Sequence, residues 1–114
     1  MSRGVWQRGD IVVASFDPTL GAEQQGRRPA IVVTHSELNR LGMIGVCPIT
    51  QGGVAARNTG FSVSLMGAGM QTAGVVLVHQ FRMIDPSQGG LTLVEQAPDD
   101  LVEEVRARVA ALLD

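Results

Sequence analysis

The sequence has little cysteine and no long apolar run. Cys47 is the one cysteine in 114 residues, which excludes an internal disulfide framework. Its apolar neighbours favour a small buried side chain over a nucleophile, because nothing nearby would lower the thiol pKa. No segment approaches the roughly 20 apolar residues that span a bilayer, and residues 1–6 lack the apolar core of a signal peptide. We therefore expect a cytoplasmic protein.

Lysine is absent as well, and all nine basic residues are arginine. The formal net charge of −2 argues at first against a nucleic-acid partner, but the charges are unevenly distributed. From Glu95 onward acids predominate, with a net charge of −4, whereas the preceding part carries a net charge of +2. Guanidinium groups suit bidentate binding of phosphate. An acidic C-terminal segment would confine nucleic-acid binding to one cationic patch.

The sequence also lacks the residue clusters of a metal site. Two separate histidines, one cysteine and no pair of acids at ligand spacing outside the C-terminal segment predict that no metal is bound. There are no repeats, low-complexity tracts or linkers. With 45% hydrophobic residues, residues 1–114 fit a single domain with its own core.

Short apolar segments separated by turn residues predict a mainly β fold. Six or seven strands are expected, at Asp10–Phe16, Ala30–Thr34, Met43–Ile49, Phe61–Leu65 and Gly74–Val78, with shorter candidates at Arg82–Ile84 and Leu91–Val94. Pro29 is expected at the first position of the second strand, and Pro86–Gly90 as a turn. A short helix is expected at Ser36–Leu41, with Ser36 as its N-cap. So many short strands are typical of a small barrel.

The last segment changes to a helical period. An apolar stripe with helical spacing follows Pro98, which is expected in the first turn; the stripe comprises Leu101, Val102, Val105, Val109, Leu112 and Leu113. Asp99 and Asp100 stand at the positive end of the helix dipole. We expect this helix to pack on the barrel.

The loop between the first two strands is the most informative feature. It is about a dozen residues long, which exceeds most connections and is typical of a functional loop. The loop and the start of the next strand bring together the carboxylate of Glu23 and the guanidiniums of Arg27 and Arg28, with amides between them. Such a segment is suited to a polar ligand.

Several motifs, in order and at consistent spacing, resemble MazF/PemK-type toxins, closest to the PemK/Kid and ChpB branch. They run from Arg8 to Asp85 and comprise Gly9-Asp10-Ile11-Val12, Phe16-Asp17-Pro18-Thr19, Gly21, Glu23-Gln24-Gln25-Gly26, Arg28-Pro29, Pro48-Ile49-Thr50-Gln51-Gly52-Gly53, Ala56-Arg57, Gly60-Phe61, Gly74-Val75-Val76 and Gln80. The resemblance implies an SH3-like (CcdB/MazF-type) barrel with a C-terminal helix. It further implies a homodimer that cleaves single-stranded RNA, such as mRNA, at short sequence motifs without metal or cofactor and is silenced by a cognate antitoxin.

The implied reaction is attack of a ribose 2′-OH on its own phosphate, which leaves a 2′,3′-cyclic phosphate. Arg28 maps onto the catalytic arginine of the family, and its donors suit the extra negative charge on phosphorus. A guanidinium is a poor general base, so we expect electrostatic stabilisation with an acid function open to it. Thr50 maps onto the catalytic threonine, and Glu23 onto a position needed for activity, as base or as partner of Arg28. Structural alternatives are an Arg28–Glu23 pair that pins the loop, a backbone-bonded Thr50 and an exposed Glu23.

His79 is where the sequence departs from its relatives. PemK/Kid-type members are thought to use an Asp there, an Arg two residues earlier and a His before the loop Glu, whereas this chain has His79, Leu77 and Ala22. The histidine has a pKa suited to proton transfer near neutrality. A base-stacking role and a purely structural role remain equally open.

Further residues are candidates for RNA binding. Arg27, Arg57 and Arg82 are candidate phosphate contacts. Gln51 and Gln80 could read base edges. Phe61 could stack on a base if it faces outward, the alternative being a core position.

Two other functions stay open at this point. One is a noncatalytic toxin on the same scaffold, of the gyrase-poison type, although the ending Ala111–Asp114 lacks the aromatic residues on which those toxins depend. The other is a catalytically dead RNA-binding or peptide-binding homologue.

Overall fold

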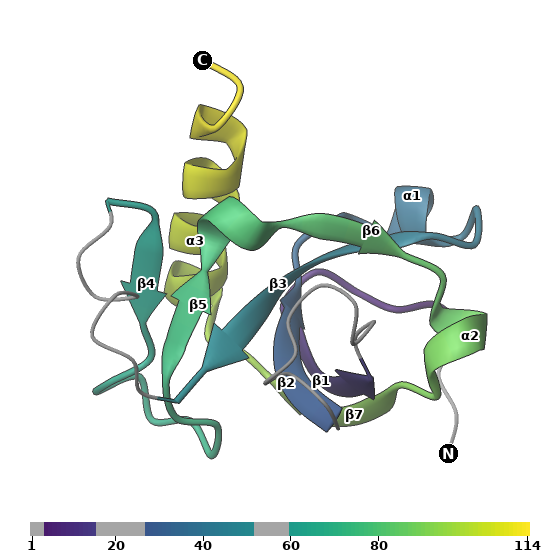
Figure 1. The fold of residues 1–114 in the computed structure, drawn as a ribbon, viewed down its shortest axis with the longest axis horizontal. Coiled ribbons are helices and arrows are strands. Elements are labelled where there is room, and N and C mark those ends of the chain that lie inside the picture. Colours follow the sequence, from purple (N-terminus) through teal and green to yellow (C-terminus); the bar gives the residue numbers. More distant parts are fainter. Residues whose placement is uncertain (1–3, 16–26, 52–59) are drawn as a thin grey trace.

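The fold is a strongly curved antiparallel sheet with a helix against it, as the computed structural model shows (Figure 1). The structure describes residues 4–15, 27–51 and 60–114. Within them, one sheet of seven strands has the order β4-β5-β3-β2-β1-β7, with β6 also paired to β3. The strands are β1 Asp10–Ser15, β2 Arg27–Val32, β3 Ile44–Thr50, β4 Ser62–Ser64, β5 Val75–Leu77, β6 Arg82–Ile84 and β7 Thr92–Gln96. The predicted barrel-like β fold is confirmed.

The strand β2 begins earlier than the sequence indicates. It starts at Arg27, so Pro29 is its third residue and lies opposite Val13 of β1, which corrects the expected first position. The ladder between β2 and β3 is formed from Ala30 to Val32 only. Pro29 therefore lies where β2 is paired on one side, the situation in which a missing N–H donor is tolerated.

The strand β3 changes partner along its length. Its first part, Ile44–Val46, pairs with β6, and its last residues, Ile49 and Thr50, pair with β5. Between them lie Cys47 and Pro48, which pair with β2 on the other side. Because Pro48 has no N–H to donate, it suits the gap between the two partners. One strand thus connects the β6 side of the sheet with the β4–β5 hairpin.

Two cores lie on opposite faces of the central strands. Alternate residues of a strand point to opposite faces, so β1, β2 and β3 contribute to both. One core includes Ile31, Cys47, Ile49 and Val76 and is covered by α3; the other includes Val12, Ala30, Val32 and Val46. Burial raises the pKa of the Cys47 thiol to about 12, and its side chain is fully buried. The predicted role of Cys47 as a small buried hydrophobe is confirmed.

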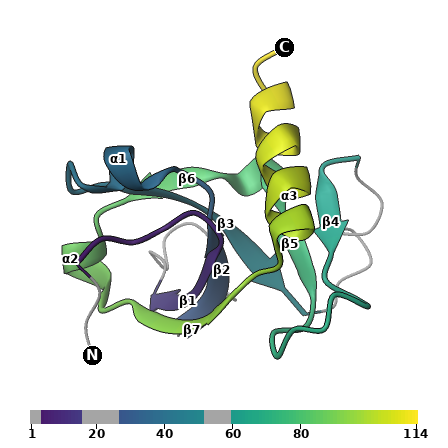
Figure 2. The same ribbon diagram turned by 180° about the vertical axis from the view of Figure 1, so that it is seen from behind.

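The C-terminal helix α3, Asp99–Ala111, is confirmed as well, and both views show it standing against β3, β4 and β5 (Figures 1 and 2). Pro98 is its N-cap and not part of its first turn. Leu101 and Val105 are buried, but Leu113 is 91% exposed because the end of the helix projects beyond the sheet. The predicted stripe is therefore buried only in its first half.

Two short helices differ from the expectations in detail. The helix α1, Ser36–Asn39, is capped by His35 and not by Ser36, since His35 Nδ1 accepts a hydrogen bond from Leu38 N at 3.3 Å. The predicted turn at 86–90 contains a one-turn helix, α2, Pro86–Gly89, with Asp85 as N-cap. None of the helices in the described ranges is long and apolar enough to cross a membrane.

Candidate active site

Arg28 and Thr50 come together at the end of two neighbouring strands. The β2–β3 ladder ends at Ala30 and Pro48, and the same spacing continued for two more residues along each strand sets Arg28 beside Thr50. The two side chains meet, since Arg28 Nη2 lies 3.5 Å from Thr50 Oγ1, with Arg28 as the donor. Both residues are half-buried. The sequence predicted both residues as catalytic, and the fold brings a guanidinium and a hydroxyl to one place.

This pair belongs to a row of residues that crosses the sheet. Arg28 lies opposite Ala14 of β1, and Thr50 lies opposite Val75 of β5, which in turn lies opposite Ser64 of β4. Residues that face each other in a ladder point to the same side of a sheet. The row therefore continues the surface around Arg28 and Thr50 onto the β4–β5 hairpin.

The backbone around Thr50 is tightly packed. Gly74 precedes β5 with a φ of +127°, and a Cβ added there would collide with the carbonyl oxygen of Thr50. Only glycine combines this backbone angle with so close an approach. Gln51 extends the contact, because its Nε2 lies 3.5 Å from the carbonyl oxygen of Ala73. The position of Thr50 thus depends on the segment that leads into β5.

Arg27, predicted to contact phosphate, also makes hydrogen bonds that hold strands together. Its Nη2 donates to the carbonyl oxygens of Val13 and Gly90, both at 2.9 Å, and to Thr92 Oγ1 at 3.1 Å. It thereby ties the start of β2 to β1 and to the start of β7.

His79, Gln80 and Phe61 gather at the other end of β5. His79 and Gln80 are exposed and belong to a 3-10 turn, Val78–Gln80, and Val78 N donates to the carbonyl oxygen of Phe61 at 2.9 Å. Val75 lies opposite Thr50. The rise per residue of a strand and then of a 3-10 helix sets His79 roughly 10 Å farther along the chain than Val75. Phe61 is 45% exposed and is thus not a fully buried core residue. The structure separates this group from Arg28 and Thr50.

Arg82 lies on the same face as the Arg28–Thr50 pair. It is opposite Val46 of β3, and Val46, Pro48 and Thr50 are successive residues on that face. Two other predicted site residues, Glu23 and Arg57, lie outside the described residues. Within the ranges that the structure describes, no group of three His, Cys, Asp or Glu side chains could hold a metal ion.

Sequence reasoning missed the residues that support this site from the hairpin. Val75 and Ser64 are ordinary strand residues, and only the ladder register reveals that they adjoin Thr50. Glu95 of β7 was counted only as part of the acidic segment. Its carboxylate accepts hydrogen bonds from Thr72 N and Oγ1, both at 2.7 Å, and from Gln71 N at 3.1 Å. A contact across 23 residues leaves no local signal in a sequence.

Comparison with known proteins gives consistent matches over nearly the whole chain. The family described as "PemK-like, MazF-like toxin of type II toxin-antitoxin system" matches residues 7–113. Endoribonuclease toxin ChpB of Escherichia coli (strain K12) is 44% identical over all of this chain and 99% of its own length. Endoribonuclease PemK of Escherichia coli is 44% identical over 94% of this chain and 81% of its own length. A crystal structure of MazE-MazF (Form-III) from Deinococcus radiodurans superposes with a TM-score of 0.78 at 31% identity, covering 96% of each chain.

Proposed function

Because the chain belongs to the PemK-like, MazF-like toxins of type II toxin–antitoxin systems, as its motifs predicted, we propose that it is an endoribonuclease that cuts single-stranded RNA. The contact between Arg28 and Thr50 carries the proposal. A guanidinium and a hydroxyl held at one point form a site for a phosphodiester, the guanidinium for the charge and the hydroxyl for a nonbridging oxygen.

The proposed reaction is an intramolecular transesterification. The ribose 2′-oxygen forms a bond to phosphorus as its proton leaves for a base, and the bond from phosphorus to the 5′-oxygen breaks as that oxygen gains a proton. The products are a 2′,3′-cyclic phosphate and a 5′-hydroxyl. Arg28 stabilises the negative charge that builds up on phosphorus, and the protein needs no metal for this step.

Two residues, Glu23 and His79, are candidates for the general base of this mechanism. Glu23 follows from the resemblance to the family, and we propose it as the base or as the group that holds Arg28. His79 is a weaker candidate for the same phosphate, since it lies roughly 10 Å farther along the chain than Val75, the residue opposite Thr50. With Gln80 and Phe61, it is better placed to contact RNA farther along the strand.

Several properties accompany this proposal. The protein is a single-domain homodimer of the cytoplasm, and a cognate antitoxin silences it by covering the face that carries Arg28 and Arg82. Support for the antitoxin comes from the similar structure described as MazE-MazF from Deinococcus radiodurans. Arg27, Gln51, Arg57 and Arg82 are proposed as RNA contacts, with Arg27 also serving the tie to β1 and β7.

A cleavage assay in EDTA tests the proposal. The purified protein is incubated with a long RNA, and the new ends are mapped and tested for cyclic phosphate. We expect wild-type protein to cut, and Arg28→Ala to lower the rate at least about 100-fold, the effect of losing one main stabiliser of transition-state charge. Thr50→Val keeps the shape of the side chain and should also lower the rate.

Arg40→Ala is the matched control, because Arg40 is exposed next to α1. This substitution removes the same charge at a place away from the Arg28–Thr50 pair. Thermal unfolding of each variant checks that its fold is intact. Cleavage that survives in Arg28→Ala would contradict the mechanism. RNA binding without any cleavage by the wild type would instead support the catalytically dead homologue.

A further inference from the structure

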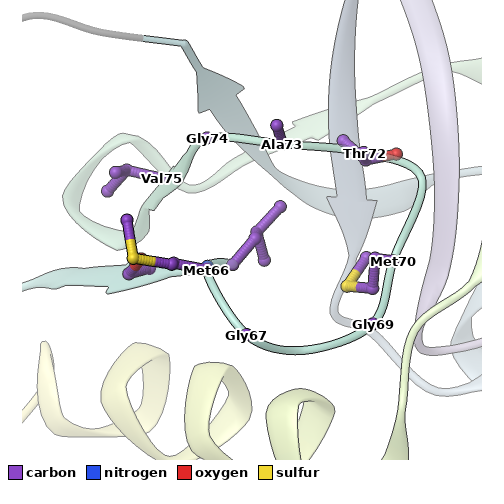
Figure 3. A pocket seen from close by; sticks show the side chains of 10 residues that line it. Met66, Gly67, Gly69, Met70, Thr72, Ala73, Gly74 and Val75 are labelled. Atoms are coloured by element: carbon purple, nitrogen blue, oxygen red, sulfur yellow. The ribbon is translucent and has the colours of Figure 1, made fainter.

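The contact between Arg28 and Thr50 depends on both side chains being held in place. Thr50 is held from the side of the β4–β5 hairpin, where Gly74 packs against its carbonyl oxygen. Figure 3 shows the segment concerned, in which Ala73 and Gly74 lead into β5. Arg28 lies on a different strand, β2, so its own support has to come from the neighbours of that strand.

Arg28 lies where the described sheet narrows to two strands. The ladder between β2 and β3 ends at Ala30, and the ladder between β1 and β7 ends at Val13. Beyond these two residues the ladders of the described chain pair β1 and β2 only with each other, and Arg28 belongs to this part. Two paired strands alone are marginally stable in water. The backbone at Arg28 therefore gains much from any further contact that fixes it.

Arg27, the first residue of β2, makes such a contact from the neighbouring position. Its Nη2 donates to the carbonyl oxygens of Val13 and Gly90, both at 2.9 Å, and to Thr92 Oγ1 at 3.1 Å. Val13 and Thr92 lie opposite each other at the end of the β1–β7 ladder. The side chain of Arg27 thus crosses β1 and joins the two-stranded end to a third strand, β7.

The alternation of side chains lets the two arginines act at the same time. Successive residues of a strand point to opposite faces, so Arg27 holds β2 from one face while Arg28 meets Thr50 on the other. The guanidinium of Arg27 also lies close to Gly90, since a Cβ added there would be 3.9 Å from Nη1. A guanidinium carries five N–H donors, so bonds made by Nη2 are compatible with a phosphate contact through another nitrogen.

We propose that Arg27 is a positioning residue, which fixes the backbone of β2 so that the Arg28 guanidinium meets both Thr50 and the phosphate. The inference rests on the proposed function, because that function makes Arg28 a catalytic residue. Misplacing a group that acts on the transition state by about 1 Å can lower a rate about 100-fold. Loss of the bonds made by Arg27 Nη2 therefore lowers the rate of cleavage, whether or not it also weakens RNA binding.

Substitution of Thr92 tests the proposal without removing a charge. Thr92 is exposed, and Thr92→Val deletes one acceptor of Arg27 while it keeps the shape of the side chain. We expect kcat for RNA cleavage to fall about 2- to 5-fold with KM unchanged. Thr92→Ser keeps the hydroxyl and should restore the wild-type kcat. Equal losses in Thr92→Val and Thr92→Ser would contradict a role of the hydroxyl.

Arg27→Ala removes all three hydrogen bonds, so its kcat should fall at least about 10-fold. Affinity for 2′-O-methyl RNA, which binds without being cut, is measured beside it. Arg40→Ala is the control for the loss of one exposed positive charge. Weaker RNA binding with full kcat in Arg27→Ala would make Arg27 a phosphate contact only and would overturn the inference.

The double variant gives an independent test. If Thr92 acts through Arg27, adding Thr92→Val to Arg27→Ala lowers kcat no further, because the hydrogen bond is already lost. A second loss of the same size would show that Thr92 acts in another way and would count against the tie.

NMR of the free protein reads the position of Arg28 without any need for cleavage. The Nε–Hε signal of Arg28 responds to the surroundings of its guanidinium. We expect this signal to shift in Thr92→Val and Arg27→Ala and to keep its place in Thr92→Ser. The Nε–Hε signal of Arg40, next to α1, is the internal control, and thermal unfolding checks that each variant is folded.

The outcomes separate this inference from the proposed function. A shifted Arg28 signal together with a lower kcat supports the inference. An Arg28 signal that stays in place in both Thr92→Val and Arg27→Ala overturns it, while cleavage by the wild type still stands. If the wild type cuts no RNA and the Arg28 signal shifts in these variants, the positioning by Arg27 is supported and the catalytic proposal is removed.

Discussion

At the scale of single residues, Cys47 gives a clean titration experiment. Its thiol is neutral in the folded protein because burial raises its pKa from 9.0 to about 12. Because the pKa is higher in the folded protein, the neutral thiol makes its full contribution to the free energy of unfolding below pH 9. This contribution is lost as the pH rises from 9 toward 12. The sequence contains no lysine or tyrosine, so few other groups titrate in that window.

We expect the free energy of unfolding to fall above pH 9 by up to about 1.4 kcal/mol per pH unit. Denaturant unfolding at a series of pH values measures this. Cys47→Ala should lack the added slope. Rapid alkylation of Cys47 in the folded protein at pH 8 would show that the thiol is accessible and would contradict its burial.

The Arg28–Thr50 pair shows what a sequence reveals at this scale. Arg28 and Thr50 were predictable because short motifs carry them and because their chemistry suits a phosphodiester. The surroundings were not, since Val75 and Gly74 look like parts of an ordinary apolar strand until the register sets them beside Thr50. His35 likewise gave no sign that its ring caps α1.

At the scale of elements, the contact between β7 and the β4–β5 loop predicts a pH-dependent order of that loop. Burial alone would raise the pKa of Glu95, but the hydrogen bonds from Thr72 and Gln71 lower it overall. Because the pKa is lowered, the ionised carboxylate stabilises the loop above pH 4.5, the pKa of the group in the unfolded chain. This stabilisation is lost as the pH falls below that value.

We expect Glu95→Gln to raise amide hydrogen exchange at Gln71 and Thr72 roughly 10- to 100-fold, the range for losing hydrogen bonds to a charged group. Exchange measured by NMR at neutral pH tests this, and Glu37→Gln, in the first turn of α1, is the control. Wild-type protein below pH 4.5 should show part of the same effect. Unchanged protection in Glu95→Gln would mean that other contacts hold the loop.

Most elements were predictable from periodicity and turn residues, and their ends were not. All seven strands and α3 were expected, and β6 has the expected bounds. The start of β2 was not expected, because a strand tolerates proline wherever one side lacks a partner, and that depends on where β3 turns away. The one-turn helix α2 depends on the carboxylate of Asp85, which also suits a simple turn.

At the scale of the whole molecule, the low net charge and the acidic residues of α3 predict that RNA binding depends only weakly on salt concentration. The chain has a net charge of −2, and α3 carries acids at its first turn. Few phosphates should therefore be neutralised. If Arg27, Arg28, Arg57 and Arg82 each contact one phosphate, the logarithm of the binding constant should fall with the logarithm of salt concentration with a slope of about −2.8.

Binding of 2′-O-methyl RNA over a series of KCl concentrations measures the slope. Arg82→Ala should make it shallower by about 0.7, whereas Arg106→Ala, on α3 and paired with Glu103, should leave it unchanged. A much steeper slope for the wild type would indicate binding over a wide basic surface.

The close approach of Gly74 to the Thr50 carbonyl has an evolutionary consequence. Any side chain at position 74 would displace the backbone of Thr50, although Arg28 and Thr50, the proposed catalytic residues, would both remain in the gene. A toxin is a burden on its host whenever its antidote is scarce, and lineages that inactivate it survive. Such lineages have a short route at this glycine, where a single missense change would displace Thr50 and so weaken the proposed activity.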